Sequence, residues 1–317
     1  MLITILGQHG PNAPLLQELV GNDHQVRTLP GFPPDGVLQT DVLITTRLTP
    51  DEAGRLQARL LHVPGAGLDA IALEAVPQGC LVCNVYEHEL PIAEFITHAI
   101  LQHQIFGESE SPVLDETHWP QEYLGRRFHG EAAGKRVAII GFGAIGRAAA
   151  QRLRALEMHV TAVTRRGTPE ALADATSHIS QLRSLLGDID YLVLSCPLTE
   201  DTRGLIGPEE LALMHPEALL INIGRAPLVD QAALYEALLH RRIGGAVLDV
   251  WHHYPQPGQT QLAPADYPFH TLPNVRCTPH ISGWTHGLIR RRYALIARNI
   301  QQLEKGAPLK NLLHQPA

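Results

Sequence analysis

Three glycines at the start of a predicted helix have the spacing of a phosphate-binding turn. The segment Gly141-Phe-Gly-Ala-Ile-Gly146 follows the apolar run Val137–Ile140 and precedes an alanine-rich helical pattern from Arg147 to Glu157. The first glycine permits a tight turn, the second lets a pyrophosphate approach the backbone, and the third allows close helix–strand packing. The phosphates would lie on the free N–H groups of the helix N-terminus, around Ala144 and Ile145. The flanking strand and helix make this motif a specific signal for a dinucleotide.

The end of the next predicted strand indicates which dinucleotide is preferred. About 20 residues after such a glycine motif, an NAD site places Asp or Glu to hold the ribose hydroxyls. In this chain Thr164, Arg165 and Arg166 follow the apolar run Val160–Val163 instead. A guanidinium pairs well with a phosphate and gains little from a neutral hydroxyl. We therefore predict NADP(H) in preference to NAD(H); the alternative is that the two arginines form only a solvated turn.

The 18 histidines and four cysteines raise the alternatives of metal binding and redox chemistry. Cys80 and Cys83 form a C-x-x-C, but three steps of about 3.3 Å along the predicted strand separate their Cα atoms by about 10 Å. That separation exceeds the reach of a disulfide. Cys196 and Cys277 are isolated in sequence and complete no zinc quartet, and no H-E-x-x-H occurs. We predict buried structural thiols and no metal.

Short apolar runs alternate with helical patterns along the chain, as in parallel βαβ units. Strands are expected at Leu2–Leu6, Asp41–Thr45, Gly79–Val85, Tyr191–Ser195, Leu219–Ile223 and Ala246–Val250, with a helix-to-strand step at Gln57–Val63. Helices are expected at Pro14–Val20, from Pro91 to Gly107, and from His286 to Lys305. Long loops are expected at Glu108–Phe128 and Tyr254–Pro273. The predicted fold class is α/β with doubly wound parallel sheets.

The composition is that of an ordinary globular protein of about two domains. Of 317 residues, 44% are hydrophobic and 18% are charged, and the formal net charge is −7. A net negative field disfavours polyanions, so we expect neither nucleic acid nor an anionic membrane as a partner. No apolar run approaches the roughly 18 residues of a membrane span, and Met1–Gly7 lacks the basic start of a signal peptide. We expect a cytoplasmic protein.

Four further blocks, together with the glycine motif, resemble the D-isomer-specific 2-hydroxyacid dehydrogenase family. They are SCPLTEDTRGLI at Ser195–Ile206, LINIGRAPLVD at Leu220–Asp230, GAVLDVW at Gly245–Trp251, and LPNVRCTPH at Leu272–His280. In order and spacing they are similar to the signature blocks of the family, and the resemblance covers nearly the entire chain. The arginines at the strand end resemble NADPH-dependent glyoxylate/hydroxypyruvate reductases more than the NAD-linked members.

The resemblance implies two Rossmann-like domains, one inserted into the other. Residues 1–87 and 285–317 would form a flavodoxin-like substrate domain, and residues 88–284 would form the dinucleotide-binding domain. The active site would lie in the cleft, and closure would exclude water. Family members are commonly homodimers through the cofactor domain, so a homodimer is expected.

The resemblance also assigns roles to individual residues. Arg225 would hold the carboxylate and the reacting oxygen of a small anionic substrate, and His280 would protonate the carbonyl oxygen as hydride arrives at carbon. Backbone N–H groups of Ala66 and Gly67 would receive the carboxylate, and His88 contacts substrate in one interpretation and is structural in the other. The cofactor would contact Gly141, Gly143, Ala144, Ile145, Gly146, Thr164, Arg165, Arg166, Cys196, Pro197, Thr199, Thr202, Ile223, Gly224, Asp249 and Gly283.

One position departs from the family pattern. The family usually carries a glutamate five positions after the aspartate that matches Asp249, and this glutamate pairs with the histidine. Here that position is Tyr254, preceded by His252 and His253. Loss of the carboxylate removes a stabiliser of imidazolium, which predicts a lower pKa for His280. Tyr254 can still orient the ring by a hydrogen bond.

This departure keeps three functions open. The first is NADPH-dependent reduction of a small 2-oxo acid, with glyoxylate and hydroxypyruvate as candidates. The second is a dinucleotide-sensing protein without turnover, because the family includes transcriptional corepressors. The third is formate oxidation, whose branch of the family carries glutamine at this position, although Asn84–His88 does not resemble that branch.

Overall fold

In the computed structural model, which describes residues 1–107, 113–256 and 258–313, the chain divides into two units. One consists of Met1–Glu87 together with Thr285–Ala317, and the other of His88–Trp284. The second unit is therefore inserted into the first along the chain. The substrate-binding and dinucleotide-binding roles expected of the two domains stay predictions.

The second unit contains a fully parallel sheet of seven strands, in the order β10-β9-β8-β11-β12-β13-β14. Its strands are β8 (Arg136–Ile140), β9 (His159–Thr164), β10 (Ala175–His178), β11 (Tyr191–Leu194), β12 (Leu219–Asn222), β13 (Gly245–Leu248) and β14 (Val275–Cys277). Counted within the unit, the order is 3-2-1-4-5-6-7, which is typical of dinucleotide-binding doubly wound sheets. The order in which successive strands are added to the sheet reverses between β8 and β11, and ligands of such sheets bind outside the carboxyl ends of the strands at that point.

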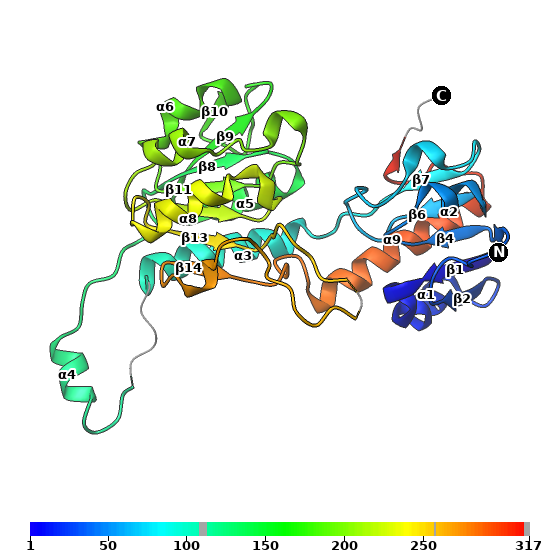
Figure 1. Cartoon of the computed structure of the whole chain (residues 1–317), viewed down its shortest axis with the longest axis horizontal. Coiled ribbons are helices and arrows are strands. Elements are labelled where there is room, and N and C mark those ends of the chain that lie inside the picture. Colours follow the sequence, from blue (N-terminus) through cyan, green and yellow to red (C-terminus); the bar gives the residue numbers. More distant parts are fainter. Residues whose placement is uncertain (108–112, 257, 314–317) are drawn as a thin grey trace. The chain divides into compact units, whose positions relative to one another are not determined.

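Helices cover both faces of this sheet (Figure 1). The covering helices are α3 (Glu89–Ile105), α5 (Ala144–Ala155), α6 (Leu182–Leu186), α7 (Pro208–Leu213) and α8 (Gln231–Leu239). A further helix of the unit, α4 (Trp119–Leu124), buries no residue and lies away from the sheet. On one face α3 and α5 pack over Ile139, and on the other face α6, α7 and α8 pack over Ile140. Consecutive residues of a strand point to opposite faces, so the continuous apolar run of β8 fits a strand that is buried on both sides.

The first unit contains a sheet in the order β15-β7-β6-β4-β1-β2, parallel except for β15. Its strands are β1 (Leu2–Leu6), β2 (Gln25–Leu29), β4 (Val42–Ile44), β6 (Leu60–His62), β7 (Leu81–Cys83) and β15 (Leu312–Leu313); β3 (Leu38–Gln39) and β5 (Leu56–Gln57) pair separately. The helices are α1 (Ala13–Val20), α2 (Pro50–Gly54) and α9 (His286–Glu304). The five parallel strands have the flavodoxin-like order 2-1-3-4-5.

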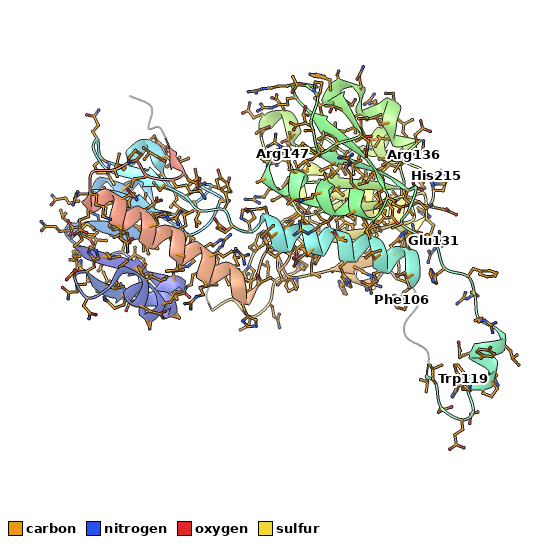
Figure 2. The ribbon with its side chains drawn as sticks, turned by 180° about the vertical axis from the view of Figure 1, so that it is seen from behind. Phe106, Trp119, Glu131, Arg136, Arg147 and His215 are labelled. Atoms are coloured by element: carbon orange, nitrogen blue, oxygen red, sulfur yellow. The ribbon has the colours of Figure 1, made fainter. Side chains whose placement is uncertain are left out.

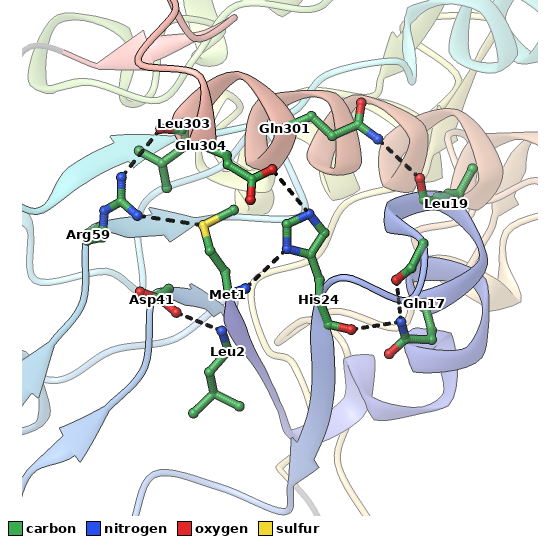
Figure 3. A network of polar contacts seen from close by, with 11 residues as sticks. Met1, Leu2, Gln17, Leu19, His24, Asp41, Arg59, Gln301, Leu303 and Glu304 are labelled. Carbon is green, nitrogen blue, oxygen red and sulfur yellow. Dashed lines mark hydrogen bonds and ion pairs between the residues drawn. The ribbon is translucent and has the colours of Figure 1, made fainter.

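Helix α9, near the C-terminal end of the chain, lies against the N-terminal elements of the first unit (Figure 3). The amino group of Met1 lies 3.2 Å from Nδ1 of His24, and Nε2 of His24 lies 3.6 Å from Oε2 of Glu304. Apolar side chains of α9, including Tyr293 and Ile296, fill the core beside β1. The C-terminal segment thus belongs to the first unit through both packing and polar contacts.

The doubly wound α/β class is confirmed, with differences in single elements. Strand β2 was not expected, because Gln25–Leu29 is a partly exposed edge strand without an apolar run. Helix α4 lies within Glu108–Phe128, where we expected only a loop; residues 108–112 of that stretch lie outside the described residues. Helix α5 begins at Ala144, three residues before the predicted start. Cys80 and Cys83 are buried free thiols, as predicted.

None of the helices in the described part of the chain combines the length and the apolar character that a membrane crossing needs.

Candidate active site

The glycine turn between β8 and α5 leaves open space for a ligand at its second glycine. A Cβ atom at Gly141, where φ is +90°, would lie 2.5 Å from the backbone nitrogen of Cys196. A Cβ atom at Gly146 would lie 2.5 Å from the carbonyl oxygen of Gly141. At Gly143 a Cβ atom would meet nothing within 4 Å. Protein packing therefore accounts for the first and third glycines, whereas the second keeps a surface clear.

The N-terminus of α5 faces this cleared surface. Gly143 is the N-cap residue and supplies no side-chain cap, so the N–H groups of Ala144 and Ile145 begin the helix without one. From the neighbouring strand end, the hydroxyl of Ser195 donates to the carbonyl oxygen of Gly141 at 2.6 Å and fixes the turn. Uncapped N–H groups and the positive end of the helix dipole favour a bound anion. The turn has the form that a pyrophosphate requires.

Two arginines occupy the turn that follows β9. The hydroxyl of Thr164 accepts a hydrogen bond from the N–H of Gly167 at 3.0 Å, which closes the turn around Arg165 and Arg166. Both arginines are exposed, and neither forms a hydrogen bond or ion pair with another residue in the described ranges. Arg147 on α5 is instead paired with Glu170 at 3.0 Å (Figure 2). Two guanidiniums beside the glycine turn suit a phosphate on the ribose.

The carboxyl ends of β11 and β12 approach the same turn. A Cβ atom at Gly224 would lie 3.0 Å from the carbonyl oxygen of Cys196, so the backbones at Gly141, Cys196 and Gly224 lie close together. Beyond Cys196, the hydroxyl of Thr202 donates to the carbonyl oxygen of Pro197 at 2.8 Å and accepts from the N–H of Thr199 at 2.7 Å. Ile223 is buried directly before Gly224. The structure thus brings most of the predicted cofactor residues to one edge of the sheet.

Arg225 follows β12 at the same edge. It is half-buried, and its Nη1 donates to the carbonyl oxygen of Gly224 at 2.9 Å. The amide of Asn222 donates to the carbonyl oxygen of Arg225 at 3.0 Å, and its Oδ1 accepts from the N–H of Gly224 at 3.1 Å. These bonds fix the backbone at the guanidinium, as positioning of a substrate carboxylate requires.

His280 lies in a loop that a buried carboxylate holds. Asp249 is fully buried after β13 and accepts three hydrogen bonds, from the hydroxyl of Thr278 at 2.5 Å and from the N–H groups of Ile281 at 2.8 Å and Ser282 at 2.9 Å. Between these anchors His280 adopts a left-handed conformation with φ of 59°. A non-glycine residue in that conformation is strained, and such strain is concentrated at functional sites.

Tyr254 is the hydrogen-bond partner of His280. Its hydroxyl oxygen lies 2.8 Å from Nδ1 of His280 and accepts a bond of 3.1 Å from the N–H of Trp251. The indole N–H of Trp251 donates to the carbonyl oxygen of Thr278 at 2.8 Å, which ties the two loops together. Tyr254 therefore makes the contact with His280 that the family resemblance would assign to a glutamate at this position.

The charges around His280 favour the neutral imidazole. Partial burial lowers its pKa from the ordinary 6.5; the Asp249 carboxylate opposes this effect, and the Arg225 guanidinium adds to it. Burial raises the pKa of Tyr254, so the phenol keeps its proton at neutral pH. The site therefore holds a neutral histidine beside a neutral phenol and a cationic arginine.

The remaining predicted residues lie in both units. Ala66 and Gly67 follow β6 in the first unit, where the carbonyl oxygen of Ala66 accepts from the amide of Asn84 at 3.0 Å. His88 is the N-cap residue of α3 in the second unit, and a Cβ atom at Gly283 would lie 3.3 Å from its Cβ. His88 and Gly283 are thus neighbours beside the His280 loop.

Two contributors were missed at the level of sequence. Trp251 acts through its backbone N–H and its indole, and Thr278 acts by fixing Asp249. Both lie inside the GAVLDVW and LPNVRCTPH blocks, so the blocks themselves were the available signal. In the described part of the chain no group of three His, Cys, Asp or Glu side chains is arranged to hold a metal ion.

Comparison with known proteins identifies the family. A family described as "D-isomer specific 2-hydroxyacid dehydrogenase, NAD binding domain" matches residues 101–282, more than half of the chain. The glyoxylate reductase of Thermococcus litoralis is 31% identical over 307 residues, which cover 90% of this chain and 88% of that protein. The chain belongs to the D-isomer-specific 2-hydroxyacid dehydrogenase family. The two Rossmann-like domains that we predicted from the sequence are the domains that this family has.

Other relatives of the family match only in part or in structure. The glyoxylate reductase of Thermococcus gammatolerans is 36% identical over 187 residues, or 59% of this chain, and the chain spans about half (52%) of that relative's length. A D-isomer-specific 2-hydroxyacid dehydrogenase from Xanthobacter autotrophicus Py2, solved with NADPH and MES, is 26% identical. It has a TM-score of 0.76 and covers 99% of this chain and 98% of that one.

Proposed function

We propose that this chain is an NADPH-dependent reductase that converts a small 2-oxo acid of the glyoxylate or hydroxypyruvate type to the 2-hydroxy acid. The observation that carries the proposal is the arrangement at one sheet edge of the second unit. There the guanidinium of the fixed Arg225 contributes to the lowered pKa of the strained His280, and His280 is held by Tyr254 and the Asp249-anchored loop. A cation and a proton donor together suit a substrate that carries a carboxylate beside a carbonyl. The similar glyoxylate reductases support the substrate class.

Each residue has a role in this proposal. Arg225 binds the substrate carboxylate and the carbonyl oxygen through its planar fork. His280 supplies the proton to the carbonyl oxygen. Bound NADPH supplies the hydride to the carbonyl carbon. The cleared surface at Gly143 and the uncapped start of α5 fit its pyrophosphate, and Arg165 and Arg166 fit its ribose phosphate.

The activity is tested by following oxidation of NADPH and of NADH with a panel of 2-oxo acids, with formate plus NADP⁺ as the reverse control. We expect NADPH to be consumed with glyoxylate or hydroxypyruvate and formate to remain unchanged. Binding of NADPH without consumption on any 2-oxo acid would favour the dinucleotide-sensing alternative. Oxidation of formate would favour the third alternative.

Removal of Arg165 and Arg166 tests the cofactor preference. In the double variant Arg165→Ala/Arg166→Ala we expect KM for NADPH to rise about 10- to 100-fold, because charge-assisted hydrogen bonds contribute about 1.5–3 kcal/mol. KM for NADH should change less than about threefold. Arg136→Ala is the matched control, since Arg136 begins β8 at the opposite edge of the sheet and pairs with Asp188. Equal effects on both dinucleotides would contradict the preference.

We also propose that two copies of the chain associate through the second unit. The segment that carries α4 extends from the body of this unit (Figures 1 and 2) and exposes large apolar side chains. Among them are Trp119 (50% exposed), Leu124 (82%) and Phe128 (107%). A concentration of exposed apolar side chains marks an interaction surface. A homodimer fits the family expectation and would cover them.

Negative charge introduced on this surface should dissociate the two copies into monomers. We expect Leu124→Asp/Phe128→Asp to convert a species of twice 34.7 kDa into one of 34.7 kDa in light scattering coupled to size exclusion. The control Leu239→Asp changes an exposed leucine at the end of α8 and should leave the mass unchanged. A wild-type chain that elutes at 34.7 kDa at assay concentration would contradict the association.

A further inference from the structure

The partner of His280 in this chain is a phenol, whereas a carboxylate is usual in the family. The Tyr254 hydroxyl lies 2.8 Å from Nδ1 of His280, with the two ring centroids 5.6 Å apart and the planes inclined at 51°. Both residues are on loops that Trp251 joins, through its backbone N–H to Tyr254 and its indole to Thr278. The contact is therefore built into the local fold.

The number of hydrogen atoms available to the two groups indicates which of them donates the hydrogen bond between Tyr254 and His280. A phenol has one proton to donate and lone pairs to accept with. One lone pair of Tyr254 already accepts the Trp251 N–H at 3.1 Å, which leaves its proton for Nδ1 of His280. The reverse direction would make the oxygen accept twice and would give the phenol proton to solvent, whereas donation from Tyr254 to Nδ1 satisfies both groups within the protein. Nδ1 then carries no hydrogen, and the single proton of the neutral imidazole is on Nε2.

We propose that Tyr254 is a positioning residue that holds His280 in the Nε2–H form and passes it a proton during reduction, so that turnover does not require the imidazolium. This proposal rests on the proposed 2-oxo acid reductase function. A carboxylate partner stores a proton by stabilising imidazolium, whereas a phenol stores the proton on its own oxygen. With tyrosine in place of glutamate, the proton to be transferred is therefore held on the phenol oxygen before the reaction, and not on the imidazolium.

The relay balances in atoms and charge. Hydride adds to the carbonyl carbon, and the π electrons of the carbonyl move to its oxygen, which takes the proton from Nε2 of His280. The O–H bond of Tyr254 breaks as an N–H bond forms at Nδ1, and a phenolate is left beside the Arg225 guanidinium, which favours the anion. After the product leaves, the proton returns from Nδ1 to the phenolate, and Nε2 takes one proton from solvent. One hydride and one solvent proton are consumed per turnover.

Burial and two charged groups determine the pKa of His280. Asp249 after β13 raises the pKa of His280, Arg225 after β12 lowers it, and burial lowers it further to a net value below 6.5. Tyr254 faces Nδ1, and His88 at the start of α3 lies beside Gly283 of the same loop. The imidazole is therefore neutral and the phenol protonated over the pH range between the lowered pKa of His280 and the raised pKa of Tyr254. This range is where the relay operates.

The pH dependence of single-turnover hydride transfer tests the relay in the full-length protein. We expect the wild-type rate to stay level as pH rises above the pKa of His280, until Tyr254 loses its proton. In Tyr254→Phe only imidazolium can supply the proton, so the rate should fall about tenfold per pH unit above that pKa. Below it the two rates should agree within about threefold. In Tyr254→Glu the fall should begin at a higher pH than in Tyr254→Phe, because a carboxylate stabilises imidazolium.

Two further measurements separate the relay from a structural role and from the proposed function. Tyr267→Phe is the matched control, since Tyr267 belongs to the same long loop and packs on Tyr235 at 5.1 Å between ring centroids; its profile should equal the wild type. A Tyr254→Phe profile parallel to the wild type at every pH would overturn the relay. Nitrogen NMR of His280 needs no turnover: we expect protonation at Nε2 in the wild type, and protonation at Nδ1 would overturn the proposal. Absence of NADPH oxidation with every 2-oxo acid would instead overturn the proposed function.

Discussion

Replacement of His280 by glutamine should lower kcat for 2-oxo acid reduction by about 10²- to 10⁴-fold, the usual contribution of a general acid. Glutamine keeps a polar group of similar reach in the loop that Asp249 anchors, but it cannot donate a proton to the developing alkoxide. The affinity for NADPH should stay within about twofold, because the glycine turn and the two arginines lie on β8, α5 and β9. Steady-state kinetics and a fluorescence titration with NADPH measure the two quantities.

A matched surface variant keeps this result specific. His240→Gln changes an exposed histidine at the end of α8 that pairs with Glu236 at 3.2 Å, and it should leave kcat unchanged. Turnover of His280→Gln within about fivefold of the wild type would mean that another group delivers the proton. Loss of NADPH affinity in the same variant would point to a disturbed fold and not to lost chemistry.

Arg225→Lys should reduce kcat/KM for the 2-oxo acid by about 100-fold or more, because truncation of a charge pair in a binding site costs about 2–5 kcal/mol. Lysine keeps the charge but not the planar fork that binds a carboxylate and a carbonyl oxygen together. Arg225→Gln, which also loses the charge, should be more severe. Steady-state kinetics with glyoxylate and hydroxypyruvate measure both effects.

The control for the arginine is Arg183→Gln, an exposed residue of α6 that pairs with Glu209 at 2.7 Å and Glu210 at 2.8 Å. It should leave kcat/KM within about twofold of the wild type. If Arg225→Lys kept full activity, a point charge would suffice and bidentate binding of the carboxylate would be wrong. If Arg225→Gln kept it, the anchor would lie elsewhere.

The buried parallel strands could be predicted from sequence because apolar runs such as Val137–Ile140 have no alternative to a sheet covered on both faces. Edge strands could not: Gln25–Leu29 and Ala175–His178 are partly exposed, and polar residues interrupt their patterns. Helix α4 escaped prediction because Trp119–Leu124 buries no residue of its own and so shows no apolar periodicity against a core. Tertiary pairing, not local preference, defines these elements.

Site residues that belong to a sequence motif could be predicted. Features of the site that depend on backbone geometry could not. Gly141 and Gly146 were found by spacing, and the structure gives each a close backbone neighbour. The left-handed conformation of His280 has no signature in the sequence, since it depends on the bonds from Ile281 and Ser282 to Asp249. The direction that we propose for the Tyr254 bond likewise rests on the N–H of Trp251, a group that every residue except proline has.

Transfer of deuterium tests the central claim most directly. The full-length protein is incubated with NADPH that carries deuterium at the transferred position of C4, together with glyoxylate or hydroxypyruvate, and the 2-hydroxy acid is analysed by mass spectrometry. The proposed function predicts one deuterium at C2 of the product. Binding of the labelled NADPH without any deuterated 2-hydroxy acid from either substrate would contradict it.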